Sequence, residues 1–122
     1  MESSNADSIL VTIKKMLGLG EDYTPFDKDI IVLINGALST LTQLGVGPEE
    51  GFSISGYQEE WPDFTDLTGK LSFVKTYVFL NVKTVFDPPS SAYVLEAYNK
   101  QIKELEWRIA VAVDPGEEEL DA

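Results

Sequence analysis

The side chains that most often perform chemistry in proteins are scarce in this chain of 122 residues. The sequence contains no cysteine and no histidine. Their absence removes thiolate nucleophiles, disulfides, cysteine zinc sites and the commonest general base near neutral pH. Catalysis would have to use carboxylates, lysine, tyrosine or serine alone. We therefore expect a protein that is not an enzyme and that holds no metal and no cofactor.

Two short segments have a faint likeness to known binding loops, but neither has the required spacing. The segment DFTDLTG, Asp63 to Gly69, lacks the alternating acidic residues of a calcium loop and the glutamate that follows them. The segment GVGPEEG, Gly45 to Gly51, lacks the lysine of a phosphate loop and the spacing of a dinucleotide fingerprint. The remaining carboxylates lie mostly in acidic segments where each would ionise, so we interpret them as solvated charges.

The net charge of −12 is concentrated in two parts of the chain. Residues 49–66 contain six acidic side chains and residues 114–121 contain five, with no basic residue in either, which accounts for −11 of the total. Binding to phosphates needs clustered lysine and arginine, so tight DNA binding is not expected. An acidic mimic of nucleic acid is an alternative, although a mimic would carry its charges along ordered helices.

Apolar periodicity predicts an all-α fold, a small bundle of about four helices in one domain over residues 1–113. The first helix is expected to be capped by Ser4, Asn5 or Asp7 and to end at Gly18. Its apolar face is expected to consist of Ile9, Leu10, Ile13, Met16 and Leu17.

The second helix is expected to start near Phe26 or Asp27 and to end at Gly45. Its buried face would contain Phe26, Ile30, Ile34, Ala37, Leu38, Leu41 and Leu44. Gly36 lies in mid-helix, where glycine costs about 1 kcal/mol relative to alanine. Either the close approach of a neighbouring helix or simple tolerance would explain it.

A third helix over about residues 71–86 is apolar around most of its circumference, so we expect it at the centre of the bundle. The Asp-Pro-Pro sequence at 87–89 ends it. Ser90 or Ser91 would then cap the last helix, and residues 114–122 are expected to form a disordered acidic tail. The apolar stripe of the last helix consists of Val94, Leu95, Tyr98, Ile102, Leu105, Ile109 and Ala112.

Residues 45–69 form a long acidic loop between the second and third helices. Loops of this length in compact domains are usually functional or mobile. The SISGYQ segment at 53–58 is compatible with a short β-hairpin. Apolar side chains argue against full disorder and are candidate contacts: Phe52, Ile54, Tyr57, Trp61 and Phe64.

Tyr93 and Trp107 lie on the side of the last helix opposite its apolar stripe. Either the 45–69 loop folds back over them, or they contact a partner, since both residue types are frequent interface anchors. Phe79, between two lysines of the third helix, poses the same choice. The candidate interface residues are Tyr93, Lys100, Lys103, Glu104, Trp107, Val111, Lys75, Phe79 and Lys83.

Residues 74–109, VKTYVFLNVKTVFDPPSSAYVLEAYNKQIKELEWRI, resemble the head–tail connector proteins of long-tailed bacteriophages and prophages, also called adaptor or head-completion proteins. The shared pattern is a valine- and aromatic-rich helix, a D-P-P-S-S break and an amphipathic helix ending in K-E-L-E-W-R-[IL]. The earlier segment IIVLINGALSTLTQLGVGP resembles the second helix of the family. The resemblance covers about residues 26–109.

The resemblance implies an all-α virion protein that assembles as a homo-oligomeric ring under the portal protein. Such a ring extends the DNA channel, through which DNA passes without specific binding, and contacts the next connector or tail-completion protein. It implies no catalytic residues. The last-helix residues Tyr93, Lys100, Lys103, Glu104 and Trp107 would face another subunit or the portal, and the 45–69 loop would reach a neighbouring ring or line the channel.

The expected location is the head–tail interface of the virion, after synthesis in the bacterial cytoplasm. The longest apolar run is far too short for a membrane span, and the N-terminus lacks the layout of a signal peptide. Because copies with a charge of −12 repel one another, the free protein is expected to be monomeric or weakly associated. The main alternative function is a small cytoplasmic helical adaptor or regulatory protein that uses the same aromatic face.

Overall fold

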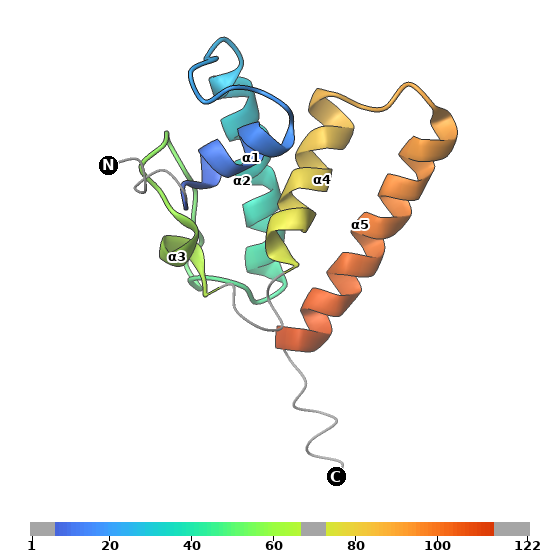
Figure 1. Cartoon of the computed structure of the whole chain (residues 1–122). Coiled ribbons are helices and arrows are strands. Elements are labelled where there is room, and N and C mark those ends of the chain that lie inside the picture. Colours follow the sequence, from blue (N-terminus) through green and yellow to red (C-terminus); the bar gives the residue numbers. More distant parts are fainter. Residues whose placement is uncertain (1–6, 67–72, 114–122) are drawn as a thin grey trace.

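The computed structural model describes residues 7–66 and 73–113, and their architecture is all-α (Figure 1). The helices are α1 (Ile9–Met16), α2 (Asp27–Gln43), α3 (Trp61–Phe64), α4 (Val74–Phe86) and α5 (Ala92–Val113). Four of them correspond to the predicted helices, and the single turn α3 was not predicted. The described ranges contain no β-strand, so the hairpin predicted at 53–58 is wrong. The predicted tail and the start of the third helix, residues 71 and 72, lie outside the described residues.

Glycines end the first two helices as the sequence predicts. Gly45 follows α2 with a φ of 98°, and the next amide, that of Val46, donates to the Leu41 carbonyl at 2.9 Å. This is the Schellman arrangement, which needs a left-handed residue. A Cβ atom on Gly45 would also lie 2.7 Å from Cγ1 of Val113 at the end of α5. Gly45 therefore both ends α2 and admits the last turn of α5.

The N-terminal ends of the helices were predicted less well. Ser8, rather than Asp7, caps α1 by accepting a hydrogen bond from the Val11 amide at 3.2 Å; Ser4 and Asn5 lie outside the described residues. Phe26 occupies the N-cap position of α2 without a side-chain cap. It is 40% exposed and contacts Phe86 edge-on at 5.3 Å between ring centroids, so its placement in the buried face of α2 was wrong.

The central helix is α4, as the sequence predicts. It packs against α1, α2 and α5, with α1 and α3 to one side of it and α5 at the opposite edge (Figure 1). Its buried side chains are Val74, Tyr77, Val78, Leu80 and Val82. Among the described residues, no atom beyond the local backbone of α2 lies within 4 Å of the place where a Cβ on Gly36 would lie, so none of the described helices approaches there and the glycine is tolerated without a packing role.

The buried face of α1 is rotated from the predicted one. Met16 is 41% exposed, whereas Val11 and the charged Lys14 are buried. The face turns because the loop after α2 covers the side of α1 that carries Lys14. Tyr57 from that loop donates into the same cluster.

The described part of the loop, residues 45–66, packs on the subunit's own helices. The Asn35 side chain on α2 accepts from the Ile54 amide at 2.8 Å and donates to the Ile54 carbonyl at 3.0 Å. The Trp61 indole donates to the Thr12 hydroxyl of α1 at 3.2 Å. These bonds satisfy backbone and indole groups that would otherwise be buried without partners.

Glu59 holds the segment in which the hairpin was expected. Its carboxylate accepts hydrogen bonds from the amide and hydroxyl of Ser55 and from the Gly56 amide. A local turn thus replaces a cross-strand ladder. The isolated bridge between Ser8 and Glu60 then connects the loop to the start of α1.

Candidate protein-interaction face

The helix α5 is packed on one side only. Ser91 caps it, accepting from the Val94 amide at 3.3 Å, which settles the choice between Ser90 and Ser91. Of its 22 residues, only Leu105 and Ile109 are buried. Val94, expected in the apolar stripe, is 36% exposed. Because α5 is at the edge of the bundle and packs mainly on α4, no helix among the described residues covers its opposite side (Figure 1).

We call this uncovered side the outer face of α5. At about 100° per residue, its centre lies about 160° around the helix from Ile109. All of its residues are exposed: Tyr93, Ala97, Lys100, Glu104, Trp107 and Val111.

Tyr93 is 83% exposed and Trp107 is 68% exposed. The described part of the 45–69 loop lies against α1 and α2 instead. The explanation in which the loop covers the two aromatic side chains is therefore wrong. The structure leaves the explanation in which another protein chain covers them, and contacts with a partner stay a prediction.

The outer face has hollows on either side of its smallest residue. Ala97 lines a hollow of about 430 Å³ together with Lys100, Gln101, Glu104, Leu105 and Arg108. It also lines a second hollow of about 160 Å³ with Tyr93, Glu96 and Lys100. Glu104 is paired along the helix with Arg108 at 3.2 Å. Along the outer face, the aromatic rings of Tyr93 and Trp107 thus lie on either side of the small Ala97 and the oppositely charged Lys100 and Glu104. Lys103 is exposed at the edge of the face.

The predicted interface residues of α4 have partners within the subunit. Phe79 is half-buried and packs against the core. Lys83 forms an ion pair with Asp87 at 3.0 Å. The ammonium of Lys75 lies 5.8 Å from the centre of the Trp61 ring, a cation–π contact. The structure therefore does not join these three residues to the outer face of α5.

The predicted loop contacts also point into the subunit. Ile54, Trp61 and Phe64 are buried, while Phe52 and Tyr57 are half-buried. The three buried side chains belong to the core, which corrects the expectation that they are available to a neighbouring ring. Contacts made by the exposed surface of the loop stay a prediction.

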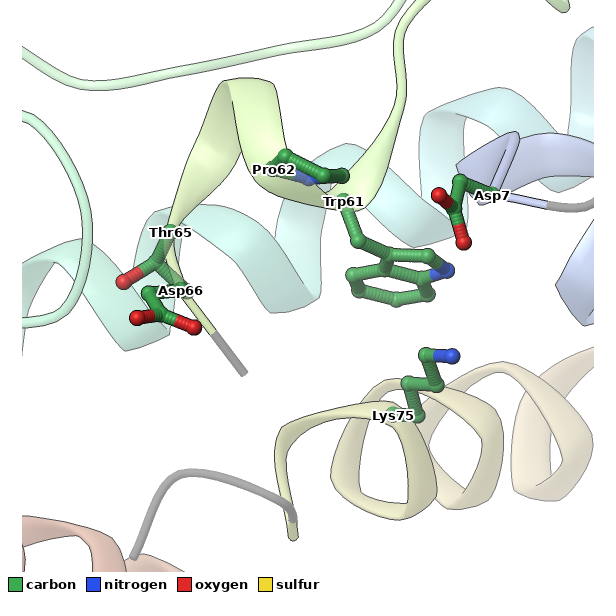
Figure 2. Close-up of a pocket in the computed structure, with 6 residues that line it drawn as sticks. All are labelled: Asp7, Trp61, Pro62, Thr65, Asp66 and Lys75. Carbon is green, nitrogen blue, oxygen red and sulfur yellow. The ribbon is translucent and has the colours of Figure 1, made fainter. Parts of the chain in front are cut away.

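A pocket of about 230 Å³ lies where α3, α4 and the start of α1 meet, lined by Asp7, Trp61, Pro62, Thr65, Asp66 and Lys75. Figure 2 shows Lys75 extending toward the indole of Trp61, with Asp7 beside the nitrogen edge of the ring. The indole is itself part of the core. We interpret the pocket as the outer edge of the contact between the loop and the helices. The part of the chain that the structure describes contains no cluster of three or more His, Cys, Asp or Glu side chains suited to a metal ion.

One polar cluster was missed from the sequence. The side chain of Lys14 is fully buried and pairs with Asp27 Oδ1 at 2.9 Å. Its ammonium also donates to the Tyr57 hydroxyl at 3.2 Å and to the Glu21 carbonyl at 3.0 Å. Tyr57 in turn donates to Asp27 Oδ2 at 2.6 Å. The cluster joins α1, the first residue of α2 and the loop.

The electrostatics of this cluster favour its charged pair and a neutral phenol. Burial lowers the pKa of Lys14, but hydrogen bonds with Asp27 and Tyr57 outweigh it, and the net pKa is raised. The hydrogen bond to Asp27, together with burial, raises the pKa of Tyr57. The signal available in the sequence was the position of Lys14, four residues after Leu10 and three before Leu17, on the face that packs.

A second hydrogen bond from a tyrosine hydroxyl to a carboxylate links α4 to α5. Tyr77 donates to the Glu106 carboxylate at 2.8 Å, and burial followed by this bond raises the pKa of the Tyr77 phenol. Along the same contact, the Arg108 guanidinium lies 5.2 Å from the centre of the Phe73 ring. These contacts fix the rotation of α5 about its axis, which determines that Trp107 points outward.

A helical bundle whose last helix leaves a continuous aromatic and charged face uncovered defines a small all-α subunit suited to contacts with other protein chains. None of the helices in the described ranges is long and apolar enough to cross a bilayer. The family described as Phage connector protein matches residues 9–116, and the chain belongs to that family. This membership confirms the resemblance and extends it to the first helix.

The family is one of structural head–tail connectors, which are generally not enzymes. It implies a place in the virion and association with other virion proteins. Comparison with curated proteins and with solved structures gives no match.

Proposed function

We propose that this protein assembles as a ring under the portal, joins the phage head to the tail and extends the DNA channel. Membership of the connector family supports the head–tail role. The observation that carries the ring assembly is the uncovered outer face of α5, where Trp107 and Tyr93 are 68% and 83% exposed.

Covering the exposed aromatic side chains of this face contributes favourably to association. A tryptophan buries on the order of 150–250 Å², and each Å² of apolar surface is worth about 25 cal/mol. Because Trp107 is 68% exposed, covering its exposed surface is worth at most a few kcal/mol before association costs. When a face of one copy contacts a different face of the next, identical subunits close into a ring if the rotation permits.

The charge distribution supports the role of a DNA channel. The loop segment 49–66 contains six acidic residues and no basic one, and the side chains of Glu49, Glu50, Asp63 and Asp66 are exposed. A lining of this kind repels phosphates, so that DNA slides through without adhering. The surface of the loop is the part of the subunit that we assign to the channel or to the neighbouring ring.

The test is to mix the purified protein with its portal and to look for an added ring of density by electron microscopy. Trp107→Ala should abolish or strongly weaken ring formation. Val32→Ala is the matched control, because Val32 is also 68% exposed but lies on α2, and this variant should assemble normally.

Far-UV circular dichroism would verify that both variants are folded. If the wild-type protein adds no density to the portal, the ring proposal is refuted. If Trp107→Ala assembles as well as Val32→Ala, the assignment of the interface to α5 is refuted instead.

A further inference from the structure

We propose that, in the free protein, the outer face of α5 is covered by the same face of a second copy, with the two helices antiparallel about a two-fold axis that crosses this face at the level of residue 102, between Lys100 and Glu104. The proposal concerns the protein before it meets the portal and does not rest on ring assembly. Its basis is the spacing of the six exposed residues along the helix. The steps between them are 4, 3, 4, 3 and 4 residues, in the order Tyr93, Ala97, Lys100, Glu104, Trp107 and Val111.

This alternation of three and four is the spacing with which two helices pack along a shared seam. It occurs here on the exposed side of α5, where packing within the subunit does not require it. Leu105 and Ile109, which do pack within the subunit, lie on the other side.

The charges in the middle of the seam determine the direction of pairing. In an antiparallel pair centred on residue 102, Lys100 lies opposite Glu104 of the second copy, and Glu104 lies opposite its Lys100. A parallel pair would instead place lysine against lysine and glutamate against glutamate. Like charges that face each other are unfavourable, so the sequence of the seam selects the antiparallel arrangement.

The shapes of the seam residues are complementary in the same register. Trp107 of one copy lies opposite Ala97 of the other, and Ala97 is the residue that lines both hollows, of about 430 and 160 Å³. The largest side chain of the seam therefore meets its smallest, beside free space that the indole can occupy. At the ends of the seam, Tyr93 lies opposite Val111, which is 37% exposed.

The large net charge of the protein does not prevent this contact, because α5 is neutral. Its three acidic residues, Glu96, Glu104 and Glu106, are balanced by Lys100, Lys103 and Arg108. At the rim of the seam, Lys103 of one copy lies near Lys103 of the other across the two-fold axis. Their repulsion is small because water screens the two exposed charges.

The pair is expected to be weak because its interface is small. Two helix faces, one from each subunit, bury less than the total of about 1,200 Å² at which standard stable interfaces begin. We therefore expect reversible association that depends on protein concentration and that the contacts of the assembled connector can replace.

Charge exchange across the seam tests the proposal by sedimentation velocity without portal. Lys100→Glu places glutamate opposite glutamate, and Glu104→Lys places lysine opposite lysine. Each variant alone should associate about tenfold more weakly than wild type, because two attractive pairs become repulsive. An equimolar mixture of the two variants restores both opposite-charge pairs and should associate nearly as well as wild type.

Cysteine crosslinking tests the register independently, because the chain has no native cysteine. Tyr93→Cys and Val111→Cys should form a disulfide when the two variants are mixed, but neither should crosslink to itself. In the antiparallel pair, two copies of position 93 are about 27 Å apart, at about 1.5 Å for each of 18 residues.

Three results would overturn the proposal. Wild type that remains monomeric up to about 1 mM would exclude the pair. Association that the charge variants leave unchanged, or a mixture that fails to recover it, would exclude the seam. Efficient crosslinking of Tyr93→Cys to itself would exclude the antiparallel direction.

Discussion

The buried ion pair between Lys14 and Asp27 gives the sharpest prediction about stability. Asp27→Asn would leave the ammonium of Lys14 buried without an anionic partner, with only neutral acceptors such as the Tyr57 hydroxyl and the Glu21 carbonyl around it. Removing one partner of a buried pair typically costs about 3–5 kcal/mol. Because the Asp27 side chain is 17% exposed, water can reach the site, and we expect the lower end, about 3 kcal/mol.

Replacing the other partner of the pair should lower the free energy of unfolding by less. Lys14→Met removes the buried charge and keeps most of the volume of the side chain, while Asp27 stays in contact with Tyr57 and partly with water. We expect a loss of about 1–2 kcal/mol in the free energy of unfolding. The double variant Lys14→Met with Asp27→Asn leaves no uncompensated charge, so it should be more stable than Asp27→Asn alone.

Urea unfolding followed by circular dichroism measures all four proteins of this double-mutant cycle. Stabilities of domains are typically about 5–15 kcal/mol, so each variant is expected to remain folded in water. Glu96→Gln, on the exposed first half of α5, serves as a control for the loss of one carboxylate. If the two single effects add in the double variant, or if Asp27→Asn costs less than about 1 kcal/mol, the pair does not stabilise the fold as we infer.

Three further predictions follow from individual contacts. Gly47→Ala should destabilise the protein by at least about 1 kcal/mol, since its φ is 83° and a Cβ would lie 2.5 Å from the Phe64 ring; thermal unfolding measures this, and no change would contradict it. Asn35→Ala should lower the free energy of unfolding by about 1–3 kcal/mol and speed amide hydrogen exchange at Ile54, because both hydrogen bonds to the Ile54 backbone are lost. Unchanged exchange would show that these two bonds are dispensable. Stability should fall as pH rises above about 10, because the raised pKa of Tyr77 means that the unfolded chain releases the phenolic proton first. Tyr77→Phe should reduce this alkaline loss but not remove it, since the pKa values of Lys14 and Tyr57 are also raised, and an unchanged slope would contradict the assignment.

The fold was predictable where local chemistry decides it. Gly18 and Gly45 end helices because they adopt left-handed backbone that other residues avoid. The broad apolar surface of α4 predicted its central position, and the spacing of α5 predicted that Trp107 lies on the side opposite its apolar stripe. Each of these inferences depends on residues within a few turns of one another.

The loop was not predictable in the same way. Its aromatic side chains were expected to be contacts for other chains, yet Trp61 and Phe64 are core residues of the subunit. No local pattern shows which surface covers them, because the partners lie far away in the sequence. The bond from Lys14 to Tyr57 spans 43 residues, and the bond from Trp61 to Thr12 spans 49.

The sequence by itself determined the helical class, the C-terminal ends of α1 and α2 and the two opposed faces of α5, because hydrophobic spacing and glycine conformation act over a single turn of backbone. Only the tertiary structure decided which of the two unpaired surfaces, the loop aromatics or the outer face of α5, the subunit covers for itself. That outcome depends on the free energy of contacts between distant segments. Here the loop packs onto α1 and α2 through the hydrogen bonds of Tyr57 with Lys14 and Asp27 and through those of Ile54 with Asn35. Trp107 is left exposed on the other side of the bundle.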